Sequence, residues 1–158
     1  MKDKTVVSIA SITFAIDQLS KIYVVHYLNL KEKISIDVVS PILNFRMAWN
    51  KGINFGLFDS GGSVSRWILV VLSVAISIML LLWVRRSENF IRQLGGAMII
   101  GGALGNAMDR IVFGAVADFL NMSCCGLQNP FSFNVADVAI FIGAFTIILW
   151  DKSENEVG

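Results

Sequence analysis

The chain has 158 residues, which is enough for one domain and short for two. Hydrophobic residues make up 55% of it and charged residues only 16%, which leaves less polar surface than a soluble domain of this size needs. The formal net charge is +1 and no dense basic cluster occurs, which argues against a nucleic-acid partner. We therefore expect a single membrane-protein domain over residues 1–158.

Side chains that bind metals or form disulfides are few. Cys124 and Cys125 are adjacent, His26 is the single histidine, and no CxxC or Cys/His metal spacing is present. A metal site would have to be built from carboxylates alone, and their spacing does not suggest one. The sequence predicts neither a disulfide framework, nor a metal site, nor a cofactor.

Four segments are candidates for membrane-spanning helices, at about residues 5–28, 67–84, 93–113 and 134–150. The second is an uncharged run that is long enough for the hydrocarbon core and is followed by two arginines. The other three contain ionisable residues, but the chain offers no soluble core in which to bury them. Because only helices and closed barrels satisfy the backbone within a bilayer, runs of this length are expected to be helices.

The polar connection between the first two helices, at about residues 29–66, contains short stretches that alternate apolar and polar residues. Ile34 to Val38 and Leu43 to Met47 have the period of half-buried strands, with Pro41 between them. The sequence therefore predicts an all-α membrane protein of four transmembrane helices, with a small β-containing domain outside the membrane.

Basic residues in short connections predict the orientation. Arg85, Arg86 and Arg92 lie between the second and third helices, and Lys2 and Lys4 lie at the N-terminus. Short basic connections remain in the cytoplasm. We expect both termini to be cytoplasmic, with the 29–66 loop and residues 114–133 on the outer face.

Ionisable residues within the expected helices are costly, by roughly 2.5–3.5 kcal/mol each on insertion scales. Asp17 and Lys21 are four residues apart, so they share a helix face and can form an ion pair. That pair either docks the first helix or contacts substrate. Asn106 and Arg110 also share a face, and Asp109 lies beside them. Arg110 can hold a carboxylate or a peptide carbonyl with its fork of donors.

Two further aspartates lie near the connection between the third and fourth helices: Asp118 within the connection and Asp137 in the first turn of the fourth helix. Asn134 has the character of an N-cap and Asp137 falls at the third helical position, so helix capping alone accounts for Asp137. However, the end of the third helix and the start of the fourth must lie at the same membrane face, so Asp118 and Asp137 share a depth. Two converging carboxyls hold one proton and can act as general base and general acid in amide hydrolysis.

Other classes of membrane protein fit less well. A small transporter or proton channel would distribute polar residues through the whole membrane depth, whereas here they gather toward one face. A thiol oxidoreductase needs relaying cysteine pairs, and Cys124 and Cys125 form one adjacent pair. A structural subunit does not explain the cost of the buried charges.

Five short motifs occur in order along most of the chain: Asp17-Gln18-Leu19-Ser20-Lys21, Asn50-Lys51-Gly52-Ile53-Asn54-Phe55-Gly56, Gly101-Gly102-Ala103-Leu104-Gly105-Asn106-Ala107-Met108-Asp109-Arg110, Gly114-Ala115-Val116-Ala117-Asp118-Phe119 and Phe133-Asn134-Val135-Ala136-Asp137. Each motif alone is weak evidence for a family. Five motifs in this order, in a chain with four expected spans, are specific evidence. In these motifs the chain resembles the bacterial lipoprotein signal peptidases (signal peptidase II).

The resemblance implies an aspartic endopeptidase of the bacterial inner membrane that acts without a cofactor, with Asp118 and Asp137 as catalytic pair at the periplasmic face. It implies that a further set of residues lines or supports the substrate pocket: Asp17, Lys21, Asn50, Gly52, Asn106, Asp109, Arg110 and Asn134. The implied partners are membrane lipids, globomycin-like inhibitors and prolipoproteins with a diacylglyceryl cysteine, cut before that cysteine; we expect a monomer.

Two positions depart from the family pattern. Asn54 stands where a small apolar residue is usual, a difference that can alter the loop's contact with substrate or inhibitor. Ala117 stands where a β-branched residue is common. Cys124 and Cys125 match no family motif.

Overall fold

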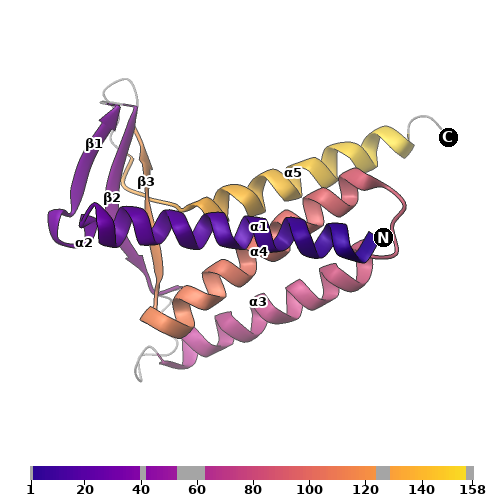
Figure 1. The fold of residues 1–158 in the computed structure, drawn as a ribbon, viewed down its shortest axis with the longest axis horizontal. Coiled ribbons are helices and arrows are strands. Elements are labelled where there is room, and N and C mark those ends of the chain that lie inside the picture. Colours follow the sequence, from indigo (N-terminus) through magenta and orange to yellow (C-terminus); the bar gives the residue numbers. More distant parts are fainter. Residues whose placement is uncertain (1, 40–41, 53–62, 124–128, 156–158) are drawn as a thin grey trace.

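The computed structural model describes residues 2–39, 42–52, 63–123 and 129–155. Four long helices run beside one another, and a three-stranded sheet lies across one end of them (Figure 1). The long helices are α1 (Lys2–Lys21), α3 (Ser63–Val84), α4 (Phe90–Phe113) and α5 (Val135–Asn155). A π-helical segment, η1 (Ile22–Tyr27), continues α1, and the short α2 (Leu30–Lys33) follows it.

The helices present an apolar surface outward. Within the described residues, two helices are long and apolar enough to cross a bilayer, Lys4–Tyr27 and Ser63–Val84, and Val135–Leu149 is a shorter apolar segment. In the most apolar 18-residue stretch of each of these two helices, only 22% and 17% of the residues are buried. A core helix of a soluble protein would be mostly buried, so these faces are suited to contact with lipid.

Helix α4 lies at the centre of the bundle and packs against α1, α3 and α5. Its glycines allow this close approach. A Cβ atom added at Gly101 would lie 2.5 Å from the carbonyl oxygen of Ala10 in α1, and one at Gly102 would lie 2.6 Å from that of Ala136 in α5. Small residues at such crossings let helix backbones meet.

The sheet contains β1 (Ser35–Val39), β2 (Leu43–Asn50) and β3 (Val116–Met122), in that order and antiparallel. The first two strands lie where the sequence pattern predicts them. The third is not predicted from the sequence, so the description of the chain as all-α is too narrow. It forms because Gly114 ends α4 with a φ of 80° and turns the chain into an extended run that pairs with β2.

One face of the sheet packs on the end of the first helix. Val25, Leu30 and Phe119 are fully or almost fully buried there, and the rings of Phe45 and Phe119 meet edge to face with centroids 5.7 Å apart. This contact fixes β3, and therefore Asp118, relative to the helices.

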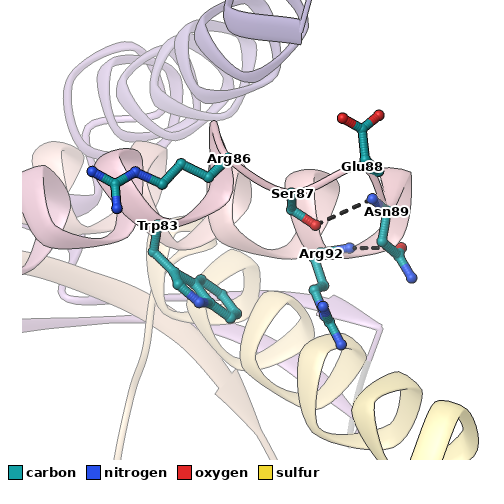
Figure 2. A pocket seen from close by; sticks show the side chains of 6 residues that line it. All are labelled: Trp83, Arg86, Ser87, Glu88, Asn89 and Arg92. Carbon is teal, nitrogen blue, oxygen red and sulfur yellow. Dashed lines mark hydrogen bonds between the residues drawn. The ribbon is translucent and has the colours of Figure 1, made fainter.

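The other end of the bundle holds the turn between α3 and α4, with the start of α1 and the end of α5 nearby (Figure 1). A surface cavity of about 590 Å³ lies at this turn, lined by Trp83, Arg86, Ser87, Glu88, Asn89 and Arg92. Asn89 caps α4 there by accepting hydrogen bonds from the backbone of Ile91 and Arg92. Figure 2 shows the second of these bonds. The cavity is at the opposite end of the molecule from the sheet.

Candidate active site

The two aspartates predicted as a catalytic pair come from a strand and a helix that meet at the sheet end of the bundle. Asp118 lies in β3, opposite Ala48 of β2, and Asp137 lies in the first turn of α5. Asp118 is only 3% exposed, whereas Asp137 is half-buried. Asn134 contacts both carboxyl groups: its side chain donates to Oδ1 of Asp118 across 2.6 Å, and its backbone N–H donates to Oδ2 of Asp137 across 3.2 Å.

Every oxygen of the two carboxyl groups accepts a hydrogen bond from an asparagine. The second oxygen of Asp118 accepts from Asn50 at 3.1 Å, and the second oxygen of Asp137 accepts from Asn106 at 2.8 Å. Asn106 in turn accepts from the side chain of Asn134 at 3.1 Å. The structure thus brings together three predicted pocket residues, one from β2, one from α4 and one from the start of α5, around the two aspartates.

Helix capping and the placement of the carboxyls are combined in one motif. Asn134 Oδ1 accepts from the backbone N–H of Asp137 at 2.9 Å, while Asp137 Oδ2 accepts from the backbone N–H of Asn134. This reciprocal pair is a capping box at the start of α5. It holds the Asp137 carboxylate at the helix N-terminus, where the helix dipole stabilises negative charge.

Asn50 is itself oriented by Gly52. The backbone N–H of Gly52 donates to Oδ1 of Asn50 at 2.9 Å, so the amide nitrogen of Asn50 is left to point at Asp118. Gly52 has a φ of 95°, a conformation that residues with a side chain rarely adopt. The spacing of asparagine and glycine in the second motif therefore has a local structural reason.

The environment of Asp118 favours its protonated form. Burial raises the pKa of this carboxyl from its ordinary value of 3.8 to about 6, and the charge of Asp137 acts in the same direction. The hydrogen bonds from Asn50 and Asn134 and the charge of Lys21 oppose the rise in pKa. Asp118 is therefore the member of the pair that holds a proton in mildly acidic solution, up to about pH 6.

A second, fully buried group of charges lies beside the two aspartates. Lys21 donates to Oδ2 of Asp17 at 2.7 Å and to Oδ2 of Asp109 at 2.8 Å, and it also donates to Asn106 at 3.3 Å. The predicted ion pair between Asp17 and Lys21 is present, with Asp109 as a second carboxylate. Gln18 donates to both carboxylates at 3.0 Å.

Arg110 lies close enough to Asp109, Asp118 and Asp137 for its charge to act on all three carboxyls. One terminal nitrogen donates to the carbonyl of Asn106 at 3.3 Å, while the buried Nε–H has no acceptor among the described residues. A buried donor without a partner is unusual in a folded protein.

Comparison with known proteins assigns the chain to a family. The model of the family described as "Signal peptidase (SPase) II" matches residues 9–151. The chain belongs to the signal peptidase II family. A lipoprotein signal peptidase of Methylobacterium radiotolerans is 43% identical over 70% of this chain and 64% of that protein, and one of Alteromonas mediterranea is 36% identical over 95% of this chain and 84% of that protein.

Solved structures agree with this assignment. A bacterial membrane enzyme determined by the in meso method at 2.3 Å resolution superposes with a TM-score of 0.77 at 26% identity, over 96% of this chain and 90% of that chain. A second such structure, at 1.9 Å resolution, gives the same TM-score at 27% identity, over 92% and 91% of the two chains. Membership of the signal peptidase II family makes the chain a membrane-bound aspartic peptidase that removes signal peptides from prolipoproteins.

Some parts of this signal peptidase II site differ from the sequence-based prediction or lie outside what can be described. Gln18, for which the sequence predicts no role, donates to both buried carboxylates; its position between Asp17 and Lys21 in the first motif is the signal that points to it. Asn54, Cys124 and Cys125 lie outside the described residues.

Proposed function

We propose that Asp118 and Asp137 are the catalytic aspartates and that they cleave the amide bond on the N-terminal side of the diacylglyceryl cysteine. The observation that carries this proposal is the contact of Asn134 with both carboxyl groups, at 2.6 Å to Asp118 and 3.2 Å to Asp137. One residue that hydrogen-bonds to both carboxyls keeps them close enough to act on one water molecule and one amide bond.

The two aspartates take different roles in the first step. The carboxylate of Asp137 accepts a proton from water, and the oxygen of that water attacks the scissile carbonyl carbon. Asp118, whose pKa is raised to about 6 chiefly by burial, holds the shared proton and gives it to the amide nitrogen as the bond to that nitrogen breaks. The products are a carboxylic acid at the end of the signal peptide and a free amine on the lipid-modified cysteine.

The half-buried Arg110 supports this step. Its charge acts on both aspartates, and its Nε–H is aligned with no acceptor among the described residues. In the reaction this donor binds a peptide carbonyl of the substrate, which places the chain across the carboxyl pair. Asn50 and Gly52 lie next to Asp118 and contribute to the pocket.

We place the site at the periplasmic face of the inner membrane, with four spans and both termini in the cytoplasm. The sheet and the carboxyl pair lie at one end of the bundle, while the start of α1 and the α3–α4 turn lie at the other (Figure 1). That turn carries Arg85, Arg86 and Arg92 in a short connection, two of which line the cavity of Figure 2. Short basic connections are retained in the cytoplasm.

This placement suits a lipid-modified substrate. Its acyl chains and apolar signal helix remain in the bilayer against exposed apolar residues such as Val71 and Met79, while water reaches the bond at the interface. Every group proposed for catalysis comes from one chain, so a monomer suffices. Globomycin-like inhibitors would occupy the same pocket and compete with the precursor.

The test is cleavage of a diacylglyceryl-modified precursor peptide by the purified enzyme and by Asp118→Asn and Asp137→Asn. Each variant should fold and insert as the wild type does but lose cleavage by at least about 1,000-fold, because neither asparagine can carry the proton. Asp37→Asn, which changes an exposed carboxylate of the same sheet, is the control. Cleavage at the wild-type rate by either dyad variant would refute the proposed pair.

A further inference from the structure

Each of two buried carboxylates outside the proposed dyad binds the backbone N–H directly before a catalytic aspartate. Asp17 Oδ1 accepts from the N–H of Ala136, which precedes Asp137, at 2.9 Å. Asp109 Oδ2 accepts from the N–H of Ala117, which precedes Asp118, at 3.2 Å. Both carboxylates are fully buried.

Lys21 joins the two carboxylates. Its ammonium donates to Asp17 at 2.7 Å and to Asp109 at 2.8 Å, and the residue as a whole is only 5% exposed. Gln18 adds a second bridge, since its amide nitrogen lies 3.0 Å from an oxygen of each carboxylate. These contacts connect α1, α4, β3 and α5, the elements that carry or adjoin both catalytic aspartates.

These contacts leave few hydrogen-bonding groups of Asp17, Lys21 and Asp109 free to bind substrate directly. The three hydrogens of the Lys21 ammonium are matched by three acceptors, on Asp17, Asp109 and Asn106. Both oxygens of Asp17 and both of Asp109 accept hydrogen bonds within the protein. Groups that are satisfied internally and buried do not need a substrate to compensate them.

We propose that Asp17, Lys21 and Asp109 form a positioning unit that sets the distance between the two catalytic aspartates through the backbone, without contacting the substrate. Asp109 positions Asp118 through the N–H of Ala117, Asp17 positions Asp137 through the N–H of Ala136, and Lys21 holds the two carboxylates together. This inference rests on the proposed function of Asp118 and Asp137. It gives the buried charges a role in turnover that neither helix docking nor substrate binding supplies.

The unit predicts a specific kinetic signature. Asp17→Ala and Asp109→Ala each remove one link to the backbone, so kcat should fall roughly 10- to 100-fold while KM stays within about twofold. Asp17→Asn and Asp109→Asn keep an amide oxygen that can still accept from the backbone N–H, so they should recover most of kcat. Lys21→Gln, which loses the bridge between the carboxylates, should lower kcat with KM again unchanged.

The control is Gln93→Leu, which removes a buried hydrogen bond of α4 to the carbonyl of Ser87 at the opposite end of the bundle. It should change thermal stability in micelles but not kcat. All variants are measured with the same precursor peptide, beside Asp118→Asn, after folding has been verified by circular dichroism.

The outcomes separate this inference from the proposed function. If Asp118→Asn still cleaves, the proposed dyad fails and the positioning unit fails with it. If Asp118→Asn is inactive but folded Asp17→Ala and Asp109→Ala keep the wild-type kcat, or raise KM at constant kcat, the positioning unit alone is wrong. If an alanine variant does not fold, its asparagine counterpart decides. A loss of kcat in that variant as large as the loss in Asp118→Asn would show that the charge of the carboxylate matters and not its bond to the backbone. That result would contradict the inference.

Discussion

The side chain of Asn134 donates a hydrogen bond to Asp118 across 2.6 Å, and the same residue caps the helix that carries Asp137. Two atoms of one amide therefore serve two purposes. The oxygen accepts from the backbone of Asp137 and stabilises the start of α5, while the nitrogen donates to Asp118 and to Asn106. Substitutions that keep one atom and remove the other can separate stability from catalysis.

Replacing Asn134 by serine and by alanine makes that separation. Asn134→Ala removes both atoms, so it should lower the free energy of unfolding by about 1 kcal/mol through loss of the cap and should lower kcat by at least about tenfold. Asn134→Ser keeps a side-chain oxygen that can cap the helix. It lacks the amide nitrogen that donates to Asp118. It should recover the stability and not kcat. Equal recovery of both quantities would show that Asn134 acts only as a cap.

The hydrogen bond from Asn50 predicts the direction of a pH effect. This bond favours the charged form of Asp118 and so opposes the rise of its pKa to about 6. In Asn50→Ala the pKa of Asp118 should rise further, so the shared proton is retained to higher pH. A hydrogen bond of about 1 kcal/mol corresponds to roughly 0.5–1 pH unit.

The measurement is kcat as a function of pH with the lipid-modified precursor. The alkaline limb of the profile should move upward in Asn50→Ala, even though kcat at its optimum falls because the carboxyl is held less firmly. Asn44→Ala, the same residue type on the same strand but opposite Asn121, should leave the limb in place. A limb that moves to lower pH would contradict the account of Asp118.

Much of the bundle could be predicted because its signals are local in the sequence. The uncharged run ending at Val84 and the cap at Asn134 are each decided by neighbouring residues, and the alternation at Leu43 to Met47 indicates a strand for the same reason. The convergence of Asp118 and Asp137 was expected from topology, since two consecutive helices must share a membrane face where they connect.

The remaining features depend on contacts that sequence spacing does not encode. Residues 116–122 are mostly apolar because β3 is buried on both faces. Such a run lacks the alternation of apolar and polar residues that identifies a strand in a sequence. The link from Asp17 to Ala136 spans 119 positions, and the role of Gln18 depends on two carboxylates from different helices. Only the folded chain shows which of the predicted polar residues contact the dyad and which act through the backbone.

The raised pKa of Asp118 also predicts how stability depends on pH. A carboxyl whose folded pKa is about 6 and whose ordinary value is 3.8 contributes stability that is fully present below pH 3.8 and is lost as the pH rises through 6. The loss is on the order of 3 kcal/mol once Asp118 is charged. Asparagine cannot ionise, so Asp118→Asn should avoid this loss.

Thermal unfolding in detergent micelles at pH 5 and pH 8 measures the effect. Because about half of the loss has already occurred at pH 5, the unfolding temperature of Asp118→Asn relative to wild type should increase by roughly 3–6 °C between the two pH values. The exposed Asp37→Asn should show a constant difference. The prediction is wrong if the difference for Asp118→Asn is the same at both pH values.

Gly105 provides a steric test of the same site. A Cβ atom at this position would lie 2.5 Å from Oδ2 of Asp17, so Gly105→Ala must displace the carboxylate that binds both Lys21 and the backbone N–H of Ala136. Gly95→Ala is the matched control on the same helix, because its Cβ would lie 2.7 Å from the carbonyl of Gly143 where α4 crosses α5 nearer the opposite end. Both variants should lose about 1–3 kcal/mol of stability through overpacking.

Their activities should differ. Gly105→Ala should lower the kcat of the folded enzyme by roughly tenfold or more, because the displaced Asp17 no longer holds the start of α5 and with it Asp137. Gly95→Ala should keep the wild-type kcat once activity is expressed per folded molecule, counted by an active-site titration with a tight-binding inhibitor. Equal losses in the two variants would mean that bundle packing as a whole, and not the position of Asp17, limits turnover.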